Sequence, residues 1–435
     1  MKVTLIADSC FIFEHNGKRI LTDPWIGTPI AGGAWIQFPP PVIKAKDVGP
    51  LDYIFISHIH EDHCDLHTIK HLDRDAEIVL MDRKPNFVAD FLDFHGLTFK
   101  KVHNIKLRDK FEITPGFLLE PVEADPAHKL NHMIDSSLLI HYDGKSIYFA
   151  NDNPPYEGLD DYLKQYDFEL AIIPPVGGSG YPAFYENLSD EEKTAKAQAI
   201  QLNYFEEMLA CLRRINPRLY SVAANGHVLS GENAGLNKFM CWPANNNEPF
   251  KYLRDNTGPE DSFRPVIIPP GVTLNLQNYD GASYEDAVIA YDNEAERTSY
   301  IEEVAAKVPY FFDSFDMRSS INFKTLFELA HGRMRDYLAR NKVDIDMRYL
   351  FPFDAEGDKR VAAIDMQAPY DLSFHDPDAA HERFLTVNVD PRALYFLLTG
   401  GFSWNIADAT GFIKYNRVPD EYHYDTYIAL NFLRI

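Results

Sequence analysis

The chain has 435 residues, of which 46% are hydrophobic and 25% are charged, and its formal net charge is −23. This composition predicts a globular protein with a packed core, and the length suits a large domain plus a smaller one. The net negative charge repels phosphates and argues against a general affinity for nucleic acid, but it leaves an anionic substrate open because bound metal ions can reverse the local field.

The sequence contains no apolar run of about 18 residues and no apolar leader segment at its start, so we expect no membrane span and no signal peptide. The four cysteines are widely separated, which predicts neither a disulfide framework nor a paired-thiolate zinc site. A cytoplasmic protein is the resulting expectation.

Strands are predicted along much of the first half of the chain. Residues 3–15 and 19–25 flank an Asn-Gly dipeptide, which predicts one β-hairpin. An Asp-Gly dipeptide predicts a second hairpin over residues 136–152. Four further apolar runs predict buried strands: 51–57, 76–81, 168–175 and 218–226.

The clearest helix is predicted over residues 190–215. Ser189 and Glu192 form a capping box at its start, and Asn216-Pro217 ends it. Strands that alternate with such helices predict a layered α/β fold.

A polar, acidic segment near residues 280–297 predicts a domain boundary. We therefore expect a first domain over residues 1–280 and a small α+β domain over residues 298–435. Within the second domain, helices are predicted near residues 322–341 and 391–401.

The segment DYIFISHIHEDHCD contains the pattern HxHxDH directly after a predicted strand, formed by His58, His60, Asp62 and His63. Residues two apart share a face of an extended segment, so His58 and His60 can bind one ion while Asp62 and His63 begin a second site. Imidazole and carboxylate ligands suit Zn²⁺, Fe²⁺ or Mn²⁺. A solvated polar loop is the alternative interpretation, but four such ligands within six residues favour a metal site.

This pattern is the hallmark of the metallo-β-lactamase superfamily, which the chain resembles. The resemblance implies an αββα sandwich that carries one or two metal ions at its strand ends, followed here by the smaller α+β domain. The family adds a further histidine, a bridging aspartate and a final histidine. It assigns these roles to His132, with His128 as the alternative, to Asp152 and to His227, and it makes Asp62 and Asp152 the catalytic candidates.

Longer stretches are similar to the catalytic part of the CMP-N-acetylneuraminate hydroxylase family, among them ILTDPWI and DSSLLIHYDGKSIYFANDNPP. Two departures matter. That family carries a Rieske iron–sulfur module, for which the four cysteines here offer no suitable set, and it has a residue other than histidine at the position of His227. We therefore expect a complete dinuclear site and do not carry over the nucleotide-sugar substrate.

Other residues are weaker candidates. Glu123 is a candidate extra ligand, by analogy with oxygen-activating members of the superfamily. Tyr181, Phe184 and Tyr185 follow a glycine-rich loop and are candidates for the wall of a substrate pocket, with core packing as the alternative. The loop lacks the lysine and the spacing of a phosphate-binding loop.

Two metal ions can support two chemistries. We expect iron, with zinc or manganese as alternatives, and an oxygenase that acts on a small polar metabolite with O₂ and a separate electron donor. Zinc has no redox chemistry and would indicate a hydrolase of an ester, lactone, amide or phosphodiester instead. A non-catalytic metal-binding scaffold is the third hypothesis.

Overall fold

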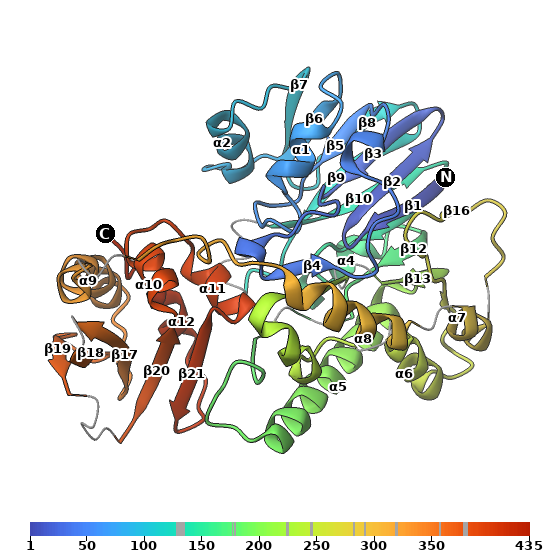
Figure 1. The fold of residues 1–435 in the computed structure, drawn as a ribbon. Coiled ribbons are helices and arrows are strands. Elements are labelled where there is room, and N and C mark those ends of the chain that lie inside the picture. Colours follow the sequence, from blue (N-terminus) through green and yellow to red (C-terminus); the bar gives the residue numbers. More distant parts are fainter. Residues whose placement is uncertain are drawn as a thin grey trace.

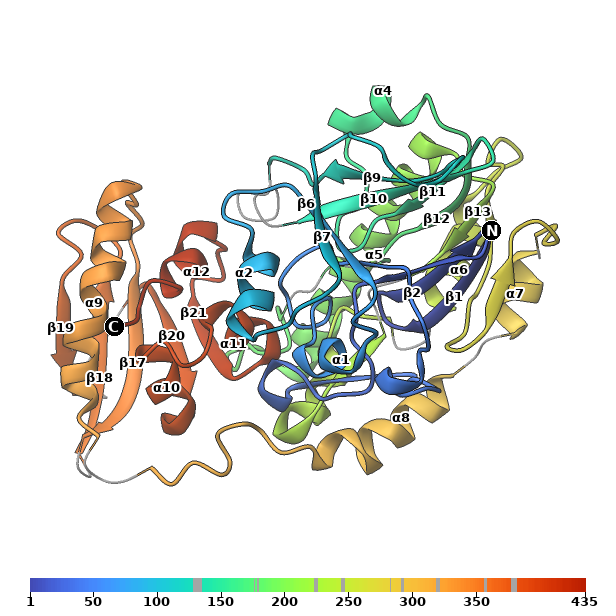
Figure 2. The same ribbon diagram turned by 90° about the horizontal axis from the view of Figure 1, so that it is seen from above.

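The computed structural model describes residues 1–127, 135–175, 177, 180–222, 226–243, 247–281, 283–290, 293–317, 321–355, 358–376 and 382–435. A two-sheet sandwich and a C-terminal domain with its own sheet lie side by side (Figures 1 and 2). None of the described helices combines the length and the hydropathy that crossing a bilayer requires.

The first sheet of the sandwich has seven strands in the order β16-β1-β2-β3-β5-β6-β7. Strands β3, β5, β6 and β7 run parallel to one another, and β1 to β3 form an antiparallel meander. In chain order, the strands are β1 (Lys2–Ala7), β2 (Cys10–His15), β3 (Lys18–Thr22), β5 (Tyr53–Phe55), β6 (Glu77–Met81), β7 (Lys101–Ile105) and β16 (Thr273–Asn275).

The second sheet also has seven strands, in the order β15-β13-β12-β11-β10-β9-β8. The predicted second hairpin is confirmed, because β10 and β11 pair antiparallel across the Asp-Gly turn. In chain order, the strands are β8 (Phe111–Thr114), β9 (Phe117–Glu123), β10 (Ser136–Tyr142), β11 (Lys145–Phe149), β12 (Phe168–Ile172), β13 (Leu219–Ser221) and β15 (Arg264–Pro265).

The prediction that residues 3–15 form one strand of a single hairpin was wrong. The chain reverses at Asp8-Ser9, so this segment is itself a hairpin of β1 and β2. Asp8 has a φ of 52°, in the left-handed region that favours turns. Its carboxylate accepts a hydrogen bond from the backbone N–H of Gly226 at 2.9 Å, which holds the turn in place.

Helices cover both outer faces, and the predicted αββα layers are confirmed. Apolar side chains of α1 (Leu66–His71) and α2 (Phe87–Phe94) pack on the first sheet, and those of α4 (Asp160–Leu163), α5 (Asp190–Ile215) and α6 (Glu248–Asn256) pack on the second. The inner faces of the two sheets share a fully buried aliphatic and aromatic core. The predicted helix over residues 190–215 is confirmed together with its capping box.

A ribbon of β4 (Trp35–Gln37) and β14 (His227–Leu229) lies outside both large sheets. The segment after the second sheet forms α7 (Tyr284–Ala290) and α8 (Glu294–Glu303), and the end of α8 packs on this ribbon. Short 3-10 turns precede and follow the ribbon strands.

The C-terminal domain has a five-stranded sheet in the order β19-β18-β17-β20-β21. Its strands are β17 (Arg348–Ala355), β18 (Asp358–Asp365), β19 (Leu372–His375), β20 (Phe384–Val389) and β21 (Ile413–Val418). Four helices pack with it: α9 (Phe323–Arg340), α10 (Pro391–Leu398), α11 (Trp404–Thr410) and α12 (Tyr424–Leu430). The position of the boundary between the domains stays a prediction.

Candidate metal centre

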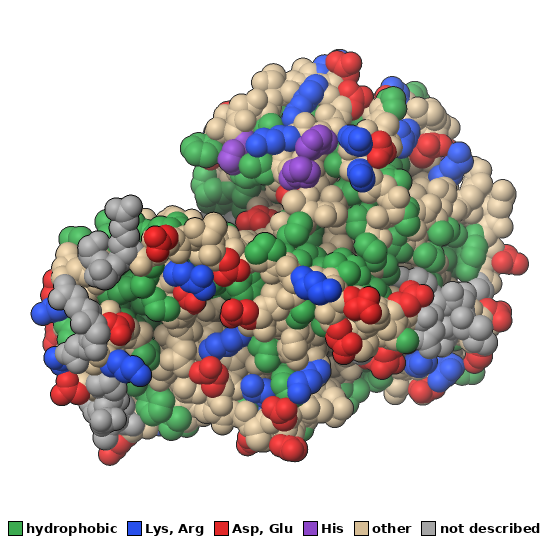
Figure 3. Space-filling model, in the orientation of Figure 1, with side chains coloured by type: hydrophobic (Ala, Val, Ile, Leu, Met, Phe, Trp, Pro, Cys, Tyr) green, Lys and Arg blue, Asp and Glu red, His purple; other side chains and the backbone are tan. Residues whose placement is uncertain are grey.

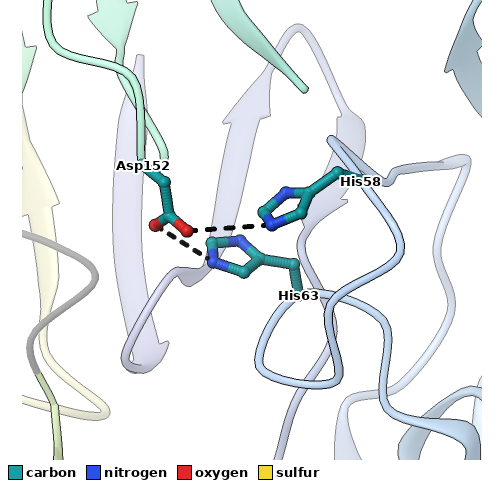
Figure 4. A group of neighbouring side chains, drawn as sticks. All are labelled: His58, His63 and Asp152. Atoms are coloured by element: carbon teal, nitrogen blue, oxygen red, sulfur yellow. Dashed lines mark ion pairs between the residues drawn. The ribbon is translucent and has the colours of Figure 1, made fainter. Parts of the chain in front are cut away.

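The histidine motif occupies the loop that leaves β5, and Asp152 occupies the loop that leaves β11. These strands belong to different sheets, so the two loops meet at one end of the sandwich. In Figure 4 the rings of His58 and His63 point toward the carboxylate of Asp152. Asp65 closes the motif by capping α1, and its side chain accepts hydrogen bonds from the N–H groups of His67 and Thr68.

One potential ligand atom from each of His58, His63 and Asp152 lies within 4.8 Å of the other two, so among the described residues these three side chains could hold a metal ion together. Nε2 of His63 is 3.1 Å from one carboxylate oxygen of Asp152. Nε2 of His58 is 3.7 Å from the other oxygen. The carboxylate therefore lies between the two rings and presents a different oxygen to each.

Each ring has a second partner from the same motif. Nδ1 of His60 lies 2.9 Å from Nε2 of His58, and Oδ2 of Asp62 lies 3.4 Å from Nε2 of His63. Two ligand atoms bound at about 2.1 Å to a tetrahedral or octahedral ion are roughly 3.0–3.4 Å apart. The distances within each pair are thus close to those of ligands that share an ion.

Buried oxygen atoms fix the far side of each ring. Nδ1 of His63 donates to Asp23 at 2.9 Å, and Asp23 also accepts hydrogen bonds from the backbone N–H and the hydroxyl of Ser57. Nδ1 of His58 lies 2.9 Å from the Ser57 hydroxyl and 3.3 Å from Asp135. Such outer partners set the tautomer and orientation of histidine ligands.

The charges of the centre act strongly on one another. Burial and the neighbouring imidazoles hold the pKa of His58 well below its ordinary value, which favours the neutral form that binds metals. Burial alone would lower the pKa of His63, but Asp152, Asp62 and Asp23 outweigh it and raise that pKa well above its ordinary value. Burial, reinforced by the charge of Asp152, raises the pKa of Asp135 to about 7.

The residues present fit a bound cation. His63 is fully buried, and within the described part of the chain its Nε2 has no hydrogen-bond partner although two carboxylates face it. A buried polar atom without a partner is costly unless something binds it. Neutral imidazole and carboxylate donors suit Zn²⁺, Fe²⁺ and Mn²⁺.

His227 begins β14 and lies close to the centre without joining its three-residue core. Its Nδ1 is 3.4 Å from the carboxylate of Asp8. The rings of Trp25, Trp35 and Trp242 surround it, with centroids 4.6–6.1 Å from the imidazole. Both alternatives for the middle histidine, at positions 128 and 132, lie outside the described residues.

The weaker candidates lie away from the three-residue core. Glu123, at the end of β9, is bound by the guanidinium of Arg108. Tyr181, Phe184 and Tyr185 contact the C-terminal domain. Their role in a substrate pocket stays a prediction.

Sequence reasoning missed the buried aspartates behind the ligands, namely Asp8, Asp23 and Asp135. Asp23 had a usable signal, because it follows a strand in the stretch ILTDPWI. Asp8 and Asp135 had none, since their roles depend on loops that approach from distant parts of the chain.

Residues 18–221 match the family model of the beta-lactamase superfamily domain. A putative Rieske 2Fe-2S iron-sulfur protein from Mycobacterium tuberculosis is 32% identical over 193 residues, which cover 43% of this chain and 36% of that protein. Cytidine monophosphate-N-acetylneuraminic acid hydroxylase from Mus musculus is 33% identical over 233 residues, covering 51% of this chain and 38% of that protein. The match thus spans little more than a third of the length of these relatives.

Among solved structures, a metallo hydrolase from Ignicoccus hospitalis aligns with 63% of this chain and 98% of that chain, at 16% sequence identity and a TM-score of 0.42.

Proposed function

Because the chain has the metallo-β-lactamase fold with an added C-terminal domain, we propose that it is a dinuclear metalloenzyme, and specifically an iron-dependent oxygenase that acts on a small polar metabolite. The observation that carries the proposal is the position of Asp152, which presents one carboxylate oxygen to each of two imidazoles, His58 and His63.

The ligand set divides into two halves around that carboxylate. His58 and His60 would hold one ion, Asp62 and His63 would hold the other, and Asp152 would bridge them. His227 would complete the second half, and His132, or His128 in its place, the first. Glu123 is a candidate extra ligand, supported by its pairing with Ser136, the residue that follows Asp135.

When bound, the metal ions would supply Lewis acidity and, if they are iron, redox chemistry with O₂ and external electrons. The protein's own contribution is positioning. Asp23 and Ser57 lock the rings of His63 and His58 in place, so the ligands are preorganised. The neighbouring imidazoles overcome the effect of burial and hold the pKa of Asp62 well below its ordinary range, so its carboxylate stays ionised and can bind a metal ion or orient a water molecule.

The preference for oxygenation is supported by the similarity to a hydroxylase in about half of the chain. An enzyme of this kind needs a separate electron donor, which a reducing cytoplasm, the location we propose, can provide. Hydrolysis of an ester, lactone, amide or phosphodiester is the second candidate, favoured by the ligand set itself, which suits redox-inert zinc equally well.

Metal analysis separates these candidates. Protein purified without added metal should contain about two irons per chain and show a charge-transfer absorption band in air. Two zinc ions per chain, with turnover of an ester or phosphodiester panel, would replace the oxygenase by the hydrolase. Bound metal with no turnover of any substrate class would leave a metal-binding scaffold.

A further inference from the structure

Arg83 lies beside the metal centre and has no part in the proposed ligand set. It follows β6 by two residues and precedes α2, whose first turn is capped by Asn86. Strand β6 runs parallel to β5, so the segment after β6 leaves the sheet next to the loop that carries the histidine motif.

The guanidinium of Arg83 is almost without partners. Among the described residues, its buried Nε and Nη1 have no hydrogen-bond acceptor and the guanidinium has no ion-pair partner. Nη2 donates only to the thioether of Met81 at 3.4 Å, and a thioether is a weak acceptor. The charge of Asp135 acts on it from beyond ion-pair distance.

Arg83 as a whole is only partly buried, but its Nε and Nη1 are shielded from solvent, and an unpaired, partly desolvated cation is unfavourable in a folded protein. Burial lowers the pKa of Arg83 to about 10, which reflects the same cost. A buried arginine fork normally binds a carboxylate or phosphate with two parallel N–H groups. Here the fork is positioned, but the described chain supplies no anion for it.

A small hollow of about 20 Å³ adjoins the guanidinium, enough for about one oxygen atom. Asn86, Phe87 and Val88 at the start of α2 line it, so the positive end of that helix faces the same space. Ser57 also lines it, and its hydroxyl contacts Nδ1 of His58. The hollow therefore reaches the back of a proposed metal ligand.

We propose that Arg83 and the start of α2 form an anion-binding subsite next to the metal centre, which takes one oxygen of a carboxylate or phosphate group. The proposal rests on the proposed function, because it makes an anionic small molecule the substrate class of that centre. Figure 3 shows a hollow between the sandwich and the C-terminal domain, on the side where Figure 1 places α2.

The test uses zinc-loaded full-length protein, with inorganic phosphate and acetate as probes in calorimetric titrations. Arg83→Gln should weaken binding of the preferred anion at least about tenfold, and Arg83→Lys should keep part of the affinity because it keeps the charge. Arg74→Gln is the matched control, since Arg74 also has a buried, unpartnered Nη1 but lies against Phe99, away from the hollow. Circular dichroism checks the fold of each variant.

Equal anion affinity in wild type, Arg83→Gln and Arg74→Gln, or no binding by the wild type at tens of millimolar, would overturn the subsite. Metal content is measured on the same samples to distinguish failure of the subsite from failure of the proposed function. Absence of anion binding in protein that holds two metal ions per chain would overturn the subsite and leave the proposed function intact. During turnover, competitive inhibition by the anion that is lost in Arg83→Gln indicates that the substrate carries the group, and activation that is lost in Arg83→Gln indicates a separate anion; either supports the subsite.

Discussion

Two buried clusters in the sandwich both combine histidine with carboxylate side chains, but they differ in whether their polar atoms have hydrogen-bond partners. On the outer face of the second sheet, Glu120 is fully buried, yet it accepts hydrogen bonds from Nε2 of His141 at 2.9 Å, from the hydroxyl of Tyr166 at 3.0 Å and from that of Tyr162. In the metal centre, Nε2 of His63 faces two carboxylates and has no hydrogen-bond partner among the residues that the structure describes.

The difference teaches how a structural cluster and a metal site can be told apart. Around Glu120 each donor meets an acceptor, and the cluster ties β9 and β10 to α4. In the metal centre, imidazole nitrogens and carboxylate oxygens converge on the same space, an arrangement that a bound cation would stabilise. Residue type and burial alone would not distinguish these two clusters; the direction of each polar atom does.

The largest expected effect comes from replacing one histidine of each cluster by alanine and comparing the two variants. His58→Ala should lower metal affinity about 100-fold or more and abolish activity while the fold persists. His141→Ala should keep the metal but lower stability, because it leaves Glu120 short of a donor. Metal analysis and urea denaturation of both variants test this, and full metal content in His58→Ala would contradict the ligand assignment.

Removing the central carboxylate of the structural cluster should cost stability without touching the metal. Glu120→Ala leaves His141 and two tyrosine hydroxyls without their acceptor, so we expect about 3 kcal/mol of destabilisation. The midpoint of urea unfolding measures the change.

Glu123→Ala is the matched control for that carboxylate. Its partner Arg108 is partly exposed, so the change in stability should stay below about 1 kcal/mol. The same variant examines Glu123 as an extra ligand, since metal loss would support that role. A similar loss of stability in both glutamate variants would mean that the buried hydrogen bonds of Glu120 contribute no more than the partly exposed ion pair of Glu123.

Sequence patterns predicted the layers and the first half of the centre because these features are local. The helix Asp190–Ile215 follows from its capping box and its periodicity, and HxHxDH places four polar groups within six residues. The turn at Asp8 was missed because it is stabilised by a hydrogen bond between its own carboxylate and the backbone N–H of Gly226, more than 200 residues further along the chain.

Pairing across distant segments also limits what could be predicted of the site. Asp135 contacts His58 only after the two sheets have packed, and Asp23 contacts His63 only after β3 and β5 have paired within the first sheet. Arg83 gives no sequence signal at all, because an unpaired arginine is recognisable only when every neighbour is known.

A smaller effect should follow from changing an outer partner of the metal centre. In Asp23→Asn, an amide replaces the carboxylate that accepts from Nδ1 of His63 and from Ser57. The ring of His63 loses its fixed tautomer, so metal affinity should fall about 10- to 100-fold. Competition with a chelator measures this affinity, and an unchanged value would show that Asp23 acts in packing alone.

The smallest effect concerns pH and the structural cluster. Burial raises the pKa of Glu120, but the hydrogen bonds from His141, Tyr162 and Tyr166 outweigh it, so the pKa lies below its ordinary value of 4.5. A lowered pKa contributes stability that is present above pH 4.5 and is lost as the pH falls through the folded-state value. Glu120→Gln does not titrate, so the wild type should be about 1 kcal/mol more stable than this variant at pH 7. That advantage should shrink in urea titrations below pH 4.5, and a difference independent of pH would mean that the cluster owes its stability to shape and not to charge.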